Sequence, residues 1–100
     1  MNQKPSVRAK NLSELKDYIA FIVLYAPDTF PERRNLDLDS AFQQLFADIS
    51  NLESKFKSNE TFNSAMEMAH QSQKLYEAGN AIKGAHVLQD LMQGIRTNRA

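Results

Sequence analysis

The chain has 100 residues, the size of one ordinary domain, with no cysteine, no tryptophan, three glycines and three prolines. Twelve Lys and Arg side chains balance twelve Asp and Glu side chains, so no net charge directs the chain to nucleic acid or an anionic membrane. The absence of cysteine excludes disulfides and a thiol nucleophile. The longest apolar run, residues 18–26, is far shorter than the about 20 residues of a membrane-spanning helix, so we expect no membrane partner and a cytoplasmic location.

The first quarter of the chain divides into an arm and a helix. Residues 1–10 carry basic side chains, no acidic one and few apolar ones, which indicates a mobile arm. Asn11 can cap a helix, with Glu14 reaching back in a loose capping box. Apolar residues then recur at helical spacing until Pro27, which disfavours helical geometry in the residue before it: Leu12, Leu15, Ile19, Ile22, Val23 and Ala26.

A long connection leads to the second helix. Residues 27–37 hold two prolines and exceed the usual length of a loop in a helical bundle, and we expect Phe30 to anchor this connection to the core. Asp37 or Asp39 can cap the second helix. This helix carries the clearest amphipathic stripe, about 100° wide: Leu38, Ala41, Phe42, Leu45, Ile49, Leu52 and Phe56.

The rest of the chain predicts a tight antiparallel hairpin. Ser58 or Asn59 caps a third helix, Gly79 supplies a left-handed closing residue and Asn80 caps a fourth helix. The third helix presents Phe62, Ala65, Met66, Ala69, Gln73 and Tyr76 on one face. The fourth presents Ala81, Gly84, Ala85, Leu88, Leu91, Met92 and Ile95, and Gly84 in the middle of this face predicts close approach of a neighbouring helix.

These patterns define a fold class. No segment alternates apolar and polar residues over the length of a strand. We therefore predict an all-α fold, a single-domain four-helix bundle with a C-terminal antiparallel helical hairpin. The bundle domain is expected to span residues 11–96, between the arm and a C-terminal tail of residues 97–100.

Two histidine–carboxylate spacings are candidates for chemistry. Glu67 and His70 have the spacing used in di-iron helical bundles, but such a site needs two copies and two further glutamates, and the chain has one copy. His86 and Asp90 lie one helical turn apart, yet no Ser, Thr or Cys in a nucleophile-like setting lies nearby in sequence. We expect solvated helix surfaces at both places, with no catalytic residue, no metal site and no cofactor.

Basic residues provide a different kind of candidate site. Arg33 and Arg34 in the long connection can bind a phosphate or carboxylate group of a partner, although nearby acids offset their charge. The basic arm and the segment with Arg96 and Arg99 lack a basic stripe interleaved with exposed aromatic residues. We therefore expect no nucleic-acid partner.

The first helix is apolar nearly all round. Tyr18, Phe21, Leu24 and Tyr25 lie off its core stripe, and a helix of this kind is usually buried on every side. Either the connection 27–37 covers these side chains with Phe30 and Leu36, or another chain does. In the second case the four residues form a self-association surface.

A second apolar surplus lies on the third helix. Met68 and Leu75 are seven residues apart and share a side of the helix, away from Met66 and Ala69. A polar stripe on the fourth helix, with His86, Gln89, Gln93 and Ile82, lies near them. An apolar centre with a polar rim is typical of a protein-binding patch, so we expect these six residues, together with Arg33 and Arg34, to bind a partner.

Residues 75–85, LYEAGNAIKGA, resemble half a tetratricopeptide repeat. In that family a tyrosine shortly before a Gly-Asn turn is common, and Gly84 stands where the family has a small residue five positions after the turn glycine. The chain has no second 34-residue copy, which excludes a repeat array.

The whole chain is similar to the small helical immunity proteins that bacteria encode beside polymorphic or contact-delivered toxins, through residues 26–31 (APDTFP), 38–42 (LDSAF) and 84–90 (GAHVLQD). This resemblance implies a protein that binds and occludes a toxin domain and has no chemistry of its own. We therefore expect a non-enzymatic protein-binding module of the immunity type. The alternatives are a homodimeric structural or adaptor protein that uses the first helix, and a nucleic-acid- or metal-binding regulator.

Overall fold

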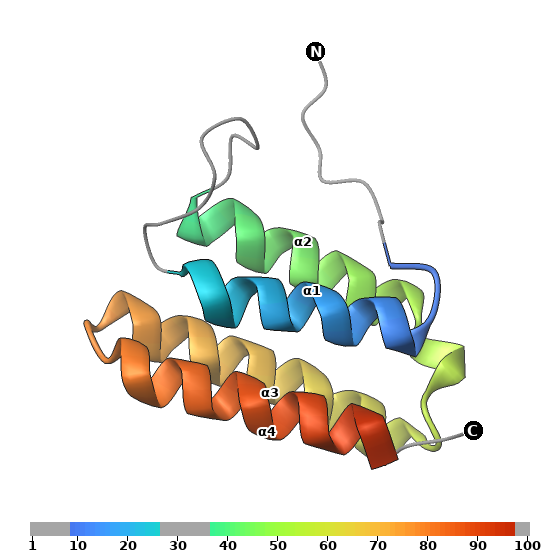
Figure 1. Ribbon diagram of the computed structural model, residues 1–100. Helices are drawn as coiled ribbons and strands as arrows, with labels where there is room; N and C mark the ends of the chain where they lie inside the picture. The colour runs from blue at the N-terminus through green and yellow to red at the C-terminus, as the bar shows by residue number, and fades with distance from the viewer. Residues whose placement is uncertain (1–8, 27–36, 98–100) are drawn as a thin grey trace.

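The computed structural model describes residues 9–26 and 37–97. Within these residues the chain forms α1 (Leu12–Tyr25), α2 (Leu38–Asn51), a 3₁₀ turn η2 (Glu53–Lys55), α3 (Asn59–Glu77) and α4 (Ala81–Thr97), and no strand. Successive helices run in opposite directions, and Figure 1 shows α1 and α2 in one layer and α3 and α4 in the other. Across the layers, α1 packs against α4 and α2 packs against α3. The predicted all-α bundle is confirmed.

The core forms where the apolar stripes of the four helices meet. The predicted stripe of α1 contributes Leu15, Ile19 and Ile22, all with no exposed surface. The rest of this fully or nearly fully buried cluster consists of Ala9, Ala41, Phe42, Leu45, Ile49, Leu52, Phe56, Ala65, Ala69, Tyr76, Leu88, Leu91 and Ile95. None of the described helices has the length and apolar character needed to cross a lipid bilayer.

Each of the first three helices starts at a predicted capping residue. The side chain of Asn11 accepts a hydrogen bond from the backbone N–H of Glu14, and the Glu14 carboxylate accepts one from the N–H of Lys10 rather than from the cap itself. Asp37 and Ser58 form capping boxes with the hydroxyl residues three positions later. The backbone N–H of Ser40 lowers the pKa of the Asp37 carboxyl below its usual value of 3.8, because this bond favours the charged form.

The second helix ends earlier than the stripe predicts. It stops at Asn51, a 3₁₀ turn follows, and Phe56 lies in extended backbone with φ −80° and ψ 149°. The N–H of Leu52 bonds to the carbonyls of both Asp48 and Ile49, which tightens the last turn. Ser and Asn side chains in this segment favour turns over helix interiors. Phe56 nevertheless reaches the core and is only 7% exposed.

Two residues just outside the expected limits of the bundle, 11–96, take part in its described structure. Ala9, assigned to the mobile arm, is 3% exposed and belongs to the core cluster. Thr97, assigned to the tail, is the last residue of α4. Residue composition alone does not reveal that a residue of the arm is buried. Residues 1–8 of the arm and 98–100 of the tail lie outside the described residues.

The buried face of α2 contains two polar residues that its predicted stripe omits. Asp48 has no exposed surface and Gln44 is 7% exposed, and the Gln44 amide Nε2 donates a hydrogen bond of 3.1 Å to Asp48 Oδ1. The position of Asp48 was visible in the sequence, since it lies three residues after Leu45 and four before Leu52 on the same helical line. The bundle therefore includes a polar pair at the edge of its core.

Candidate interaction surface

The outer stripe of α4 contains four of the predicted partner-binding residues. Ile82, His86, Gln89 and Gln93 are all exposed, and Ile82 at 75% is the most exposed large apolar side chain among the described residues. Counted at about 100° per residue, His86 lies about 160° from buried Leu88. The structure thus brings these four residues together on the solvent side of α4.

Met68 and Leu75 lie elsewhere, on the side of α3 that borders α4. Both are half-buried, and Met68 packs against the core. The facing line on α4 is Val87 and Gly94, also seven residues apart, and Gly94 lines the same cleft as Met68. By helical counting Asp90 separates this line from His86. The predicted patch is therefore two adjoining features, the line of Met68 and Leu75 at the α3–α4 seam and a polar stripe beside it.

The seam is tight where the hairpin turns. Gly79 has φ +86°, and its N–H and that of Asn80 bond to the carbonyls of Tyr76 and Leu75 at 3.1 and 2.8 Å. This pattern is a Schellman motif, which closes α3 and aims the chain back along it.

Past the turn, Ser72 of α3 and Gly84 of α4 are in direct contact, because the Ser72 hydroxyl donates a 2.8 Å hydrogen bond to the Gly84 carbonyl. A Cβ atom at Gly84 would lie 2.8 Å from Cδ2 of Tyr76, too close for two carbon atoms. The close approach predicted from Gly84 is thus present, and Tyr76 is its partner.

Tyr76 is a buried phenol at this tight end. Its side chain is 5% exposed and its ring lies 5.9 Å from that of Phe42, centre to centre. Its hydroxyl has no hydrogen-bond partner among the described residues. Burial raises the pKa of Tyr76 above its usual value of 10.0, because the phenolate would lose its hydration.

The other end of the seam opens into a cleft of about 90 Å³. Its walls are mostly apolar, with Ala65 and Met68 from α3, Leu91 and Ile95 from α4, and Phe56 from the segment before α3. The hydroxyl residues Thr61 and Ser64 and the backbone of Gly94 complete the lining. A Cβ atom at Gly94 would meet no other atom within 4 Å, so this glycine leaves space where Gly84 leaves none.

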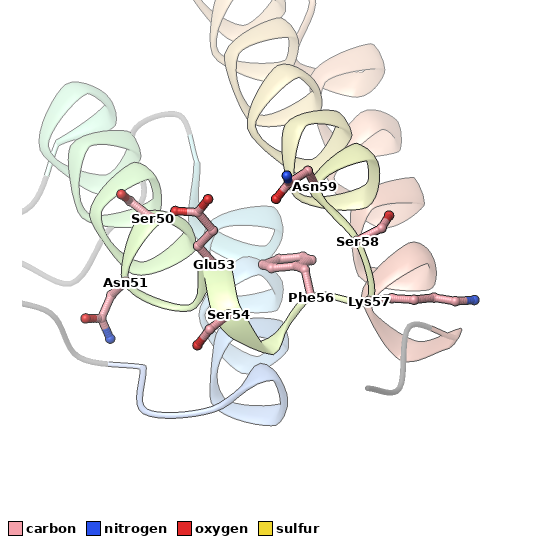
Figure 2. A pocket seen from close by; sticks show the side chains of 8 residues that line it. All are labelled: Ser50, Asn51, Glu53, Ser54, Phe56, Lys57, Ser58 and Asn59. Carbon is pink, nitrogen blue, oxygen red and sulfur yellow. The ribbon is translucent and has the colours of Figure 1, made fainter.

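Phe56 also borders a second, more open hollow of about 570 Å³ along the α2–α3 connection. Figure 2 shows the Phe56 ring between the end of α2 and the start of α3, with Glu53 on one side and Asn59 on the other. The rest of the lining is polar: Ser50, Asn51, Ser54, Lys57 and Ser58. The hydroxyl of Ser58 is already committed to capping α3. An apolar cleft and a polar hollow therefore adjoin at Phe56.

The predicted self-association residues of α1 divide into two groups. The Tyr18 hydroxyl donates a hydrogen bond to the carbonyl of Ala41, and Tyr18 and Phe21 stack on each other and pack against the core. Tyr25 is half-buried and its ring contacts Phe21. Leu24 alone of the four is exposed, at 68%. Much of the apolar surplus on α1 is therefore covered by the bundle itself, and the proposed cover by residues 27–36 lies outside the described residues.

The histidine–carboxylate pairs lie on helix surfaces. Glu67, His70, His86 and Asp90 are all exposed. The His70 ring stacks on Phe46 of α2, with ring centres 4.2 Å apart. The described residues contain no group of three or more His, Asp or Glu side chains placed to hold a metal ion. Arg33 and Arg34 lie outside the described residues.

Sequence reasoning missed the residues that shape the cleft. Gly94 and Ser64 were given no role and Ala65 was placed only on the core face of the third helix, although a small residue on each side of a predicted helix seam is the signal that could have located a gap. Comparison with protein-family models, with curated proteins and with solved structures finds no match to this chain.

Proposed function

We propose that this protein is a non-enzymatic protein-binding module that acts through the α3–α4 face, and that it works as an immunity-type inhibitor by occluding a toxin domain. The observation that carries the proposal is the apolar surface on this face, where Ile82 is 75% exposed on the outer stripe of α4 and Met68 and Leu75 are half-buried at the α3–α4 seam. Burial of a large exposed aliphatic side chain against a partner is favourable, and the polar groups in the same row can form hydrogen bonds around it, so this face favours contact with another protein.

The test is recovery of a partner by the full chain expressed with an affinity tag in the cells it comes from. We expect one protein in stoichiometric amount, and we expect Met68→Glu and His86→Glu to lose it while circular dichroism shows an intact fold. Gln43→Glu, an exposed position on α2 in the other layer, is the matched control. A chain recovered alone, or equal recovery by all three variants, contradicts the proposal.

The inhibitor form of the proposal has its own readout. Expression of the full chain should restore growth to cells that express the toxin encoded beside its gene, and Met68→Glu should abolish this protection. Protection by that variant at the wild-type level would contradict the α3–α4 face as the inhibitory surface.

A homodimer is the second candidate function, favoured by the 68% exposure of Leu24. In Figure 1 the end of α1 and the start of α4 lie at the same end of the bundle. Light scattering distinguishes the two functions. A monomeric mass at all concentrations excludes the homodimer, whereas a dimeric mass that Leu24→Glu reduces to that of a monomer supports it.

A further inference from the structure

The outer stripe of α4 has the spacing of a coiled-coil seam. Its residues Ile82, His86, Gln89 and Gln93 follow one another at intervals of four, three and four. In a coiled coil this alternation defines the a and d positions, whose side chains pack against a second helix. All four side chains are exposed, so no helix of the described bundle covers them.

Two opposite charges flank the outer stripe on the same side. Lys83 and Asp90 are exposed and seven residues apart, so both occupy the flanking position that is called e in a coiled coil. They lie about 10 Å apart along α4, too far to pair with each other. Because α4 has no other acidic residue, it provides no carboxylate within one turn of Lys83.

A second copy of the chain that runs in the opposite direction provides complementary groups for this stripe. With a twofold axis between the copies, Ile82 would lie opposite Gln93 of the second copy, and His86 opposite its Gln89. The imidazole and the amide can form hydrogen bonds with each other. The Ile82 side chain, 75% exposed in the single chain, would pack on the methylene groups of Gln93.

The flanking charges favour this antiparallel orientation over the parallel one. In an antiparallel pair the e positions of the two helices lie side by side, so Lys83 of each copy would be within about 3 Å of Asp90 of the other along the helix axis. Twofold symmetry forms this ion pair twice. In a parallel pair an e position faces a g position, which on α4 is Ala85 or Met92, and no opposite charges meet.

The other charges near the outer stripe are compatible with the antiparallel orientation. On α3, Lys74 lies nearer the hairpin turn and Glu67 farther from it, the same polarity as along α4. Arg96 would lie opposite the hairpin turn of the second copy, where the exposed Glu77 ends α3. The other neighbour of α4 is α1, which carries adjacent charges of both signs, Lys16 and Asp17.

We propose that a second copy of this chain packs antiparallel on the outer stripe of α4, with Lys83 of each copy paired with Asp90 of the other. The self-complementary order of these two charges carries the inference, which goes beyond the proposed function and does not depend on it. The dimer covers Ile82 and His86, so a paired copy has this part of the α3–α4 face closed to other proteins. It also differs from a homodimer through Leu24, which uses α1.

The test measures the mass of the full chain by sedimentation equilibrium. A seam of two heptads is small, so we expect a reversible dimer between about 10 μM and about 1 mM. Lys83→Glu and Asp90→Lys each replace both attractive pairs by repulsive ones, and each should raise the dissociation constant of the dimer by about tenfold or more. The double variant restores both pairs with the signs exchanged, so its dissociation constant should return to within about threefold of the wild-type value.

A mixture of the two single variants tests the orientation. In an antiparallel mixed dimer every flanking pair joins opposite charges, whereas each variant paired with itself joins like charges. Native mass spectrometry should therefore show a mixed dimer formed from two proteins that are each mainly monomeric alone. Gln43→Glu on α2 is the control, which should dimerise as the wild type does, and circular dichroism checks that all variants fold.

A monomeric mass at all concentrations, wild-type dimerisation of both single variants, or a mixture that stays monomeric would overturn the proposal. A dimer that Leu24→Glu dissociates and Lys83→Glu leaves intact would place the contact on α1 and overturn it as well. Recovery of a cellular partner by the tagged chain tests the proposed function separately, so failure of one can be told from failure of the other.

Discussion

The seam between α3 and α4 has two unlike ends, and a glycine of α4 lies at each. Near the turn, Gly84 is buried, accepts the Ser72 hydrogen bond and leaves no room for a Cβ atom beside Tyr76. At the open end, Gly94 is exposed and a Cβ atom there would meet nothing within 4 Å. The same residue type thus permits contact in one place and leaves a gap in the other.

The two ends of the seam have different roles: the tight end packs the helices together, and the open end offers a surface to a partner. At the tight end α3 and α4 pack closely against each other and leave little apolar surface for a partner. At the open end, small residues on both helices leave apolar walls that no side chain of the described bundle fills. The tight end therefore determines the stability of the hairpin, and the open end is the part of the seam suited to binding.

The largest effect is expected from Gly84→Leu. Its side chain would overlap the Tyr76 ring and push the helices apart, so the free energy of unfolding should fall by about 3 kcal/mol. Urea denaturation followed by circular dichroism measures this loss, with Gly94→Leu as the matched control. Equal stability of Gly84→Leu and Gly94→Leu would show that the two ends of the seam do not differ in the space they leave for a side chain.

Ser72→Ala tests the hydrogen bond across the tight end. The Ser72 hydroxyl is fully buried and donates to the Gly84 carbonyl, so its loss should cost about 1.5 kcal/mol in urea denaturation. Ser64→Ala at the exposed position near the open end should change stability by less than about 0.5 kcal/mol. A larger loss from Ser64→Ala than from Ser72→Ala would reverse the comparison.

Tyr76→Phe should stabilise the protein by about 1 kcal/mol, because it removes a buried hydroxyl that lacks a partner among the described residues. Its effect also depends on pH. The raised pKa of Tyr76 means that its contribution to stability is fully present below pH 10.0, the usual value, and is lost as pH rises through the folded-state pKa.

Melting temperatures from pH 8 to 11 check this dependence. The wild-type protein should lose more stability than Tyr76→Phe at the alkaline end of this range. Identical pH profiles would show that the phenol is hydrated in the folded protein.

The smallest effect is expected from Gly94→Ala. A methyl group enters open space there, and alanine favours the helix over glycine, so the free energy of unfolding should rise by about 0.5 kcal/mol. Thermal denaturation compares it with Gly84→Ala, which should be destabilised by the contact with Tyr76. A loss of stability at Gly94 would mean that the open end is closed in solution.

Most of the fold could be read from local sequence. Asn11, Asp37 and Ser58 cap helices as predicted, because a capping residue and its bond partner lie within three positions of each other. The positive φ of Gly79 and the close approach at Gly84 were predicted for the same reason, since a turn and an interrupted apolar face are visible within one hairpin.

The candidate site was predicted only in part. Ile82, His86, Gln89 and Gln93 share a surface as expected, because one helix places them by its own geometry. Met68 lines the cleft together with Gly94 and Leu91 of α4, neighbours from another helix that the pattern along α3 does not show. Helical periodicity gives the angular position of each residue around the axis of its own helix. It does not show how close the axes of two helices lie along their length.

The sequence by itself therefore determined the four helices, their starts and their buried faces, all of which depend on interactions within a few residues along the chain. Only the tertiary structure decided that Phe56 reaches the core from outside α2 and that the α3–α4 seam opens at Gly94. Each of these features depends on contacts between residues far apart in the chain, where the space left by one element is set by the shape of another.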